Sequence, residues 1–183
     1  MAVRPIFTIG HSKRPVDEFV ALLQQSSVDL VVDVRAFPRS RTNPQFNEDS
    51  LPQSLAGAGM RYVHLGKLGG RRRASRAPSR NTLWRHSAFR NYADYAGGPE
   101  FRAGLEQLLT LAERHTCALM CAEALWWRCH RRIIADYLLA REIAVAHIMG
   151  PGKVTDAQLT PGARIAVDGT VSYFGSAPES PSI

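Results

Sequence analysis

The sequence is poor in cysteine and has no long apolar run. Its 183 residues include only three cysteines, at Cys117, Cys121 and Cys129. An odd number within one short stretch does not suit a disulfide framework and favours a reducing compartment. No apolar stretch approaches the roughly 20 residues of a membrane helix, and residues 1–5 lack the apolar core of a secretory signal. We therefore expect a cytoplasmic protein that does not enter a membrane.

Acidic residues are absent from Ser50 to Ala93. This segment contains nine of the 23 basic residues and none of the 16 acidic ones, while the net charge of the whole chain is +7. A positive charge concentrated in one segment indicates an anionic partner, such as nucleic acid or a nucleotide. The alternative is a solvated loop whose arginines only aid solubility. For the first interpretation, the phosphate-binding candidates are Arg71, Arg72 and Arg73.

Apolar strand patterns alternate with helical patterns along the chain. Strands are predicted near 6–9, 30–35, 60–65, 117–122 and 144–148, and helices near 15–23, 51–58, 101–112 and 127–141. This alternation predicts a single α/β domain with a mostly parallel sheet and helices on both faces. We expect the domain to span 1–150, with a basic loop at 66–87. The extension 151–183 should hold a β-hairpin at 164–174 around a type I′ turn at Asp168-Gly169, then a frayed tail.

Polar residues follow the predicted strands at the point where each strand ends. Because ligands bind at the carboxyl ends of parallel strands, these residues are the candidates for chemistry. The set comprises His11 and Ser12 after the first strand, Asp33, Arg35 and Ser40 in and after the second, His64 at the end of the third, and Cys121, Glu123, Cys129, His130 and Arg131 after the fourth.

Two carboxylates in this set are candidates for acid–base work. Asp33 lies within an apolar strand, where an unpaired carboxylate is costly. It is either a buried partner of Arg35 or a general base, and both roles can coexist. Glu123 is either a residue that satisfies free amides at a helix start or the second catalytic carboxylate. His11 and His130 are secondary acid–base candidates.

Cys121 is either a nucleophile assisted by His130 or a small core residue. The phosphatase pattern of a cysteine followed after five residues by arginine is absent. Cys129 and His130, with Cys121 and a remote His11, His64 or His147, could build a zinc site. The two-residue cysteine spacing of common zinc sites is absent, however, so we expect no metal and no cofactor. Arg131 opposes the dipole of a helix start, and we expect it to grip an anion bound there.

The motif set resembles the family called domain of unknown function 488. The matching blocks are Thr8-Ile9-Gly10-His11-Ser12, Asp33-Val34-Arg35 with Pro38 and Ser40, Tyr62-Val63-His64-Leu65-Gly66 with Leu68-Gly69-Gly70, and Cys121-Ala122-Glu123 followed by Cys129-His130-Arg131. The resemblance spans about residues 6–150, and Phe89, Tyr92 and Ala93 fit its middle helix. It implies one α/β domain with a polar site built from these blocks, and it supplies no reaction.

The leading hypothesis from the sequence is a hydrolytic enzyme acting on nucleic acid or a nucleotide, with an N-glycosidic bond as one candidate. Asp33 and Glu123 would form its acid–base pair. Ser12, Arg35, Ser40, Arg131 and the loop arginines would hold phosphates. The alternatives are a cysteine-dependent enzyme acting on a small molecule and a non-catalytic nucleic-acid-binding module.

Overall fold

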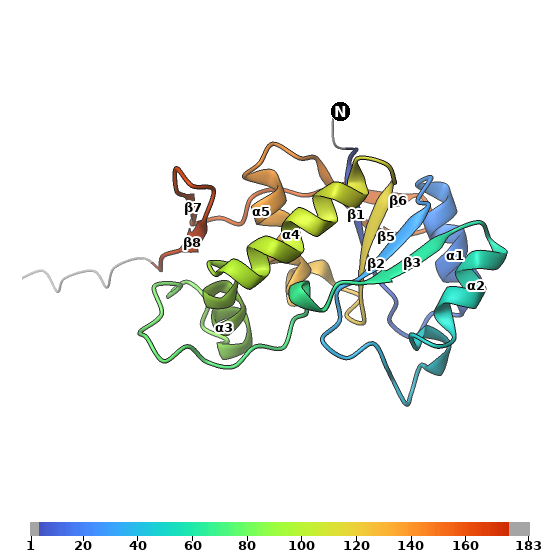
Figure 1. Cartoon of the computed structure of the whole chain (residues 1–183), viewed down its shortest axis with the longest axis horizontal. Coiled ribbons are helices and arrows are strands. Elements are labelled where there is room, and N and C mark those ends of the chain that lie inside the picture. The colour runs from blue at the N-terminus through green and yellow to red at the C-terminus, as the bar shows by residue number, and fades with distance from the viewer. Residues whose placement is uncertain (1–3, 176–183) are drawn as a thin grey trace, which may run out of the picture.

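The computed structural model describes residues 4–175 and contains one large sheet. The sheet has six strands in the order β3-β2-β4-β1-β5-β6, and only β6 runs antiparallel to its neighbour (Figure 1). In chain order the strands are β1 (Ile6–Gly10), β2 (Leu30–Asp33), β3 (Arg61–His64), β4 (Cys117–Cys121), β5 (Val145–Gly150) and β6 (Lys153–Asp156). The predicted α/β class with a mostly parallel sheet is therefore confirmed.

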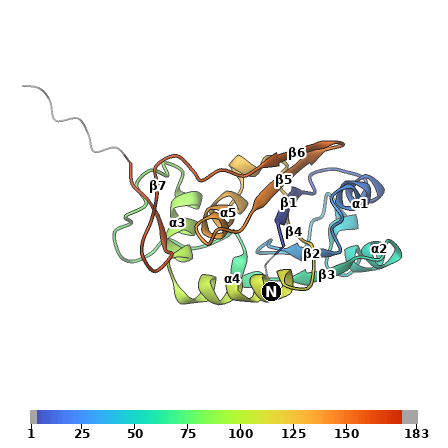
Figure 2. The same cartoon turned by 90° about the horizontal axis from the view of Figure 1, so that it is seen from above.

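Helices cover both faces of this sheet, as the alternation predicts (Figure 2). The helices α1 (Val16–Gln25) and α2 (Leu51–Gly57) bury Phe19, Leu23 and Leu55 against one face. The helices α3 (Ser87–Ala96), α4 (Pro99–Ala112) and α5 (Arg131–Leu139) pack on the other. The two clusters use alternate residues of the same strands: Val31 faces the first and Val32 the second. Such strands, apolar on both sides, are typical of a parallel sheet.

Short 3₁₀ turns shape the connections at the carboxyl end of the sheet. They are η1 (Pro44–Phe46), η2 (Gly66–Leu68) and η3 (Trp126–Arg128). The helix predicted near 127–141 therefore begins later, at Arg131, because η3 and an extended Cys129 precede it. The basic loop ends at Ser87, where α3 starts.

The C-terminal segment differs from the prediction in two details. β6 lies beyond the predicted domain boundary at 150 and pairs with β5, so the sheet continues into the expected extension. The predicted hairpin forms from β7 (Ala163–Ile165) and β8 (Val171–Tyr173). Its turn is not type I′, because Gly169 has a positive φ of 79° and Asp168 does not. Instead, the Gly169 N–H donates to the Ala166 carbonyl. The predicted tail lies outside the described residues apart from Gly175.

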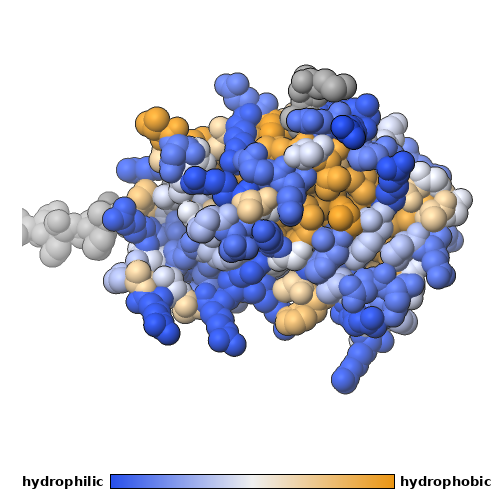
Figure 3. Space-filling model, viewed as in Figure 1, coloured by the Kyte–Doolittle hydropathy of each residue, from blue (hydrophilic) through white to orange (hydrophobic). Residues whose placement is uncertain are grey.

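Within residues 4–175, none of the helices combines the length and apolar character needed to cross a membrane. Hydrophilic side chains dominate the face seen in Figure 3. They include those at its lower left, where Figure 1 shows the loop between η2 and α3.

Candidate functional site

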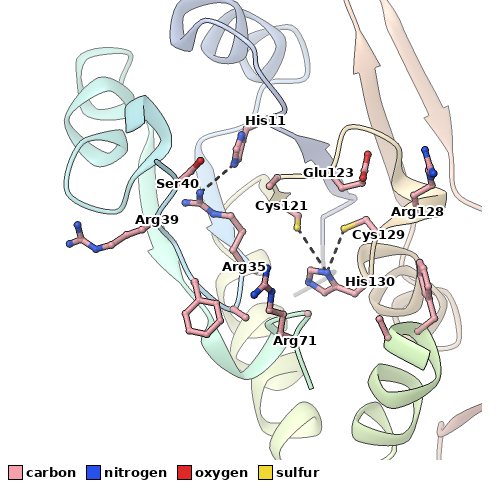
Figure 4. Close-up of a pocket in the computed structure, with 16 residues that line it drawn as sticks. His11, Arg35, Arg39, Ser40, Arg71, Cys121, Glu123, Arg128, Cys129 and His130 are labelled. Carbon is pink, nitrogen blue, oxygen red and sulfur yellow. Dashed lines mark hydrogen bonds between the residues drawn. The ribbon is translucent and has the colours of Figure 1, made fainter. Parts of the chain in front are cut away.

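A cavity of about 530 Å³ opens at the carboxyl end of the sheet (Figure 4). Its wall comes from the ends of β1, β2 and β4, from the turn before α5, from the basic loop and from the start of α3. The loops that follow parallel strands meet at one edge, and this brings distant segments together. The lining residues that carry polar or aromatic groups are His11, Arg35, Phe37, Arg39, Ser40, Arg71, Phe89, Cys121, Glu123, Arg128, Cys129 and His130.

Many of the residues predicted from strand ends do line this cavity. The ones that do are His11, Arg35, Ser40, Arg71, Cys121, Glu123 and His130. The cavity wall does not include Ser12, Asp33, Arg72, Arg73 and Arg131. Cys129, which belongs to the polar set after the fourth strand, also lines it. Four further lining residues carry no such prediction from the sequence: Phe37, Arg39, Phe89 and Arg128. Proximity to a strand end was a signal for Arg39, but nothing local distinguishes Phe37 from a core aromatic.

Asp33 is fully buried beneath the cavity, and its carboxylate is already satisfied. Oδ1 accepts hydrogen bonds from the backbone N–H and Nε of Arg35, and Oδ2 accepts from Nη2 of Arg35 at 2.6 Å and from the Tyr62 hydroxyl at 2.7 Å. Burial and the neighbouring Asp33 charge raise the pKa of Tyr62, so that hydroxyl remains a donor. Asp33 is therefore a positioning residue for Arg35, and the buried ion pair foreseen between them is present. This geometry leaves the predicted pair of catalytic carboxylates without one member.

His11 lies beside Arg35 and is held in one tautomer. Its Nδ1 donates to the Ser12 carbonyl at 2.8 Å, which leaves Nε2 to accept from Nη1 of Arg35 at 3.3 Å. The ring also stacks on Phe46, with 4.3 Å between centroids. Burial, and then the charge of Arg35, lower the pKa of His11 to about 4 despite the hydrogen bond to Ser12. His11 is therefore a neutral acceptor near pH 7 that orients Arg35.

Two cysteine sulfurs and one imidazole nitrogen converge on the cavity wall. His130 Nδ1 lies 4.0 Å from the Sγ of Cys121 and 3.5 Å from the Sγ of Cys129. The other ring nitrogen, Nε2, donates to the Val34 carbonyl at 2.8 Å, so the ring is held with Nδ1 facing the sulfurs. The backbone of Gly70 lies against the ring, because a Cβ there would overlap Nδ1 and Cε1.

The two cysteines differ in their ionisation. Burial opposes ionisation of Cys129, but its hydrogen bond with Cys121 and the positive charges beside it lower the pKa of its thiol. The guanidinium of Arg131 contributes, with Nε donating to the Cys129 Sγ at 3.3 Å. The same hydrogen bond with Cys129, together with burial, raises the pKa of Cys121. Of the two thiols, Cys129 is therefore the more readily ionised, rather than the predicted nucleophile Cys121.

Arg131 anchors the loop between β4 and α5 rather than facing the cavity. It is buried, its Nη2 donates to the Glu123 carbonyl and its Nη1 donates to the Thr8 hydroxyl. Gly10 makes room for this loop, because a Cβ at Gly10 would overlap the Glu123 carbonyl oxygen. With its N–H groups engaged by the protein, Arg131 does not have the anion-gripping role expected from its place at a helix start.

The positive charge at the cavity comes from arginines of three separate segments. Arg39 follows β2, Arg71 lies in the basic loop and Arg128 ends η3. Arg39 also pairs with Glu48 and Asp49 at the surface. Among residues 4–175, Glu123 is the only acidic residue that lines the cavity. An anion that enters this cavity meets an excess of positive charge.

The predicted phosphate-binding arginines of the loop fall into two groups. Arg71 and Arg73 are exposed, and the guanidinium of Arg71 lies 5.6 Å from the ring centroid of Phe37. Arg72 instead donates to the carbonyls of Gly69 and Gly66 and lies 3.7 Å from the ring centroid of Tyr95. Arg72 therefore folds the loop onto α3, and its guanidinium is not free for a phosphate.

Comparison with known proteins gives one match. The model of the family described as "Domain of unknown function DUF488" matches residues 15–138. No curated protein and no solved structure matches the chain significantly. The matched region runs from the start of α1 to the last turn of α5 and so includes the cavity-lining residues after β2 and β4. The resemblance seen in the sequence motifs is confirmed, and this chain belongs to the family of domain of unknown function DUF488.

Proposed function

We propose that the protein is a hydrolytic enzyme that takes one nucleotide, free or at an accessible position of a nucleic acid, into the cavity at the carboxyl end of the sheet. The observation that carries this proposal is the composition of the cavity wall. Arginines from three segments surround a wall that also bears an acid, an imidazole and aromatic rings. The arginines would bind the phosphate of the nucleotide. The bond to be hydrolysed would lie near the acid and the imidazole.

The size and the aromatic rings of the cavity suit a nucleotide. A volume of about 530 Å³ lies within the range of roughly 300–1,000 Å³ that is usual for small-molecule sites. Phe37 lies at the cavity wall and is 66% exposed, so its ring is accessible to a ligand in the cavity. A nucleobase stacks on such a ring irrespective of its sequence. Arg71, close to Phe37, is placed to hold a phosphate of the same nucleotide.

Glu123 is the acid–base residue in this proposal. It lines the cavity and is exposed, and one carboxylate oxygen accepts from the Leu125 N–H at 3.2 Å. This contact fixes the side chain but leaves the second oxygen to take a proton from an attacking water. Arg35, oriented by Asp33 and His11, supplies positive charge at the floor of the cavity.

The test is an assay for hydrolysis with the full chain. Nucleoside mono- and diphosphates, single strands and duplexes are incubated with the protein, and released base, phosphate or nucleoside is separated by chromatography. We expect turnover of at least one class, with kcat reduced by about 10²–10⁴-fold in Glu123→Gln. Glu113→Gln, an exposed acid at the end of α4, is the matched control and should keep full activity. Turnover in Glu123→Gln equal to wild type would overturn the assignment of Glu123, and no turnover on any substrate would overturn the proposal.

A second candidate, a cysteine-dependent enzyme, is favoured by the 4.0 Å approach of Cys121 Sγ to His130 Nδ1 at the cavity wall. In that case alkylation of Cys121 at neutral pH should abolish turnover of a small anionic substrate. Glu123→Gln should then have little effect, which separates the two candidates. Cys117, at the far end of β4, is the internal control for nonspecific alkylation.

A further inference from the structure

We infer that Cys121, Cys129 and His130 bind a Zn²⁺ ion whose fourth coordination position opens into the cavity. The three ligand atoms lie within 4.8 Å of one another. Two thiolates and one imidazole form a ligand set that zinc uses in catalytic sites, where an exchangeable water completes the tetrahedron. The two-residue cysteine spacing of common zinc sites, whose absence predicts no metal, is not required here. Here the loop after β4 folds back and brings two cysteines eight positions apart to the same point.

The distances fit a tetrahedral ion closely. Zinc-to-sulfur bonds of about 2.3 Å and zinc-to-nitrogen bonds of about 2.0–2.1 Å place a sulfur and a nitrogen ligand about 3.6 Å apart. His130 Nδ1 lies 3.5 Å from Cys129 Sγ and 4.0 Å from Cys121 Sγ. Both nitrogen-to-sulfur distances therefore lie within about 0.4 Å of the distance expected in a tetrahedral site.

The surrounding hydrogen bonds are those of a prepared ligand set. A ligating histidine usually donates its other ring N–H to a carboxylate or a backbone carbonyl, which fixes the tautomer. His130 does this through Nε2, which donates to Val34. Arg131 Nε donates to the Cys129 sulfur at 3.3 Å and supports a thiolate there. Gly70 packs on the imidazole and limits rotation of the ring.

Binding exchanges thiol protons for metal bonds. The protons that Cys121 and Cys129 still carry leave to the buffer, and two zinc–sulfur bonds and one zinc–nitrogen bond form. All three ligand residues line the cavity, so a water at the fourth position faces it. Zinc lowers the pKa of such a water to about 7. The role of this water rests on the proposed function: it is the nucleophile of the hydrolysis, and Glu123 on the same cavity wall accepts its proton.

The test is a titration of reduced, metal-free full chain with Co²⁺, followed by displacement with Zn²⁺. We expect one Co²⁺ per chain, with the thiolate-to-cobalt charge-transfer absorption and the strong visible bands of a tetrahedral site. Cys121→Ser, Cys129→Ser and His130→Gln should each weaken binding by more than about 10-fold, the smallest loss seen for a mere supporting partner. Cys117→Ser removes a buried cysteine at the opposite end of β4 and should leave the spectrum unchanged.

Several outcomes would overturn the inference. These are the absence of charge-transfer absorption in the folded, reduced wild type, a Cys117→Ser spectrum that loses it, or full binding in Cys129→Ser. The wild-type titration does not depend on the folding of any variant. Recovery of only one free thiol after mild oxidation, combined with no cobalt binding after reduction, would identify Cys121 and Cys129 as a redox pair instead.

This test is separate from that of the proposed function. A chain that binds cobalt through sulfur but hydrolyses nothing retains the zinc site and refutes the hydrolase. A chain that hydrolyses a nucleotide equally well after removal of the metal retains the hydrolase and refutes the zinc-bound water as its nucleophile, while the cobalt titration alone decides whether the zinc site exists.

Discussion

The guanidinium of Arg35 closes over the carboxylate of Asp33 in a buried ion pair, with Nη2 2.6 Å from Oδ2. Both residues come from the end of β2, and Tyr62 from β3 completes the hydrogen bonds of the carboxylate. In this ion pair, Nη1 of Arg35 is directed at His11. The Arg35 side chain also forms part of the cavity wall. Asp33, which the sequence offers as a catalytic carboxylate, therefore positions the guanidinium of Arg35.

Asp33→Asn should destabilise the protein strongly. Removal of one member of a buried pair leaves the other charge uncompensated, which costs about 3–5 kcal/mol. Urea denaturation at neutral pH measures this loss. Glu18→Gln, which breaks the exposed pair between Arg14 and Glu18, is the control and should cost less than about 1 kcal/mol. Equal effects of the two substitutions would contradict a structural role for Asp33.

His147 should make the protein acid-labile. His147 is a buried residue of β5, and its Nδ1 lies 2.7 Å from the hydroxyl of Thr8 on the neighbouring strand β1. Burial, and then the charge of Arg131, lower its pKa from 6.5 to about 4. Between these values the unfolded chain binds a proton that the folded chain does not. Stability from this residue is therefore complete above pH 6.5 and is lost as the pH falls to about 4, by up to roughly 3 kcal/mol.

The measurement is the free energy of unfolding of wild type and His147→Gln from pH 7.5 to pH 4.5. Because the variant lacks the titrating group, the stability gap between the two proteins should narrow on acidification. The difference between the curves removes the contribution of all other groups. Parallel curves would show that His147 does not carry the acid lability.

Gly10→Ala should distort the loop that carries Glu123. A Cβ at this position would overlap the backbone of Glu123 and Ala124, and backbone cannot move aside as a flexible side chain does. We expect a loss of about 3 kcal/mol or more and a loss of ligand binding in the cavity. Gly57→Ala in α2 adds a methyl group with no atom within 4 Å and should be neutral or slightly stabilising. Thermal unfolding of both variants tests the prediction, and a fully stable Gly10→Ala would refute it.

The proposal of a nucleic-acid ligand predicts that Arg71 and Arg73 account for part of the salt dependence of its binding. If each contacts a duplex phosphate, changing both to Ala flattens the slope of log affinity against log salt by about two. Arg72 is left intact because it holds the loop to Tyr95. The matched control, Arg61→Ala with Arg114→Ala, removes the same charge from exposed positions away from the cavity. Two unrelated duplexes should respond alike, since phosphate contacts carry no sequence information. Equal slopes for the two double variants would leave the loop without a specific role.

The local pattern of the sequence predicts the framework well, because it rests on the residues of each segment. The run from Leu30 to Val32 is apolar on both sides, which is typical of a central strand in a sheet covered on both faces. The sequence does not predict the edge strand β6, because all four of its residues are exposed and apolar residues do not alternate with polar ones along it. The turn at Gly169 was predicted in place but not in type, since the dipeptide Asp-Gly serves more than one turn geometry.

The sequence by itself determined the α/β class, the family and the edge of the sheet at which polar residues collect. Only the tertiary structure decided which of them face the cavity. Asp33 and Glu123 both follow strands, yet one is buried in an ion pair and the other is exposed on the cavity wall. Cys121 and Cys129 meet at His130 because the loop between them closes against Gly10 and is tied to Arg131. The contact with Gly10 joins residues more than 100 positions apart, and the contact with Arg131 depends on how the loop folds back, so no local spacing encodes either of them.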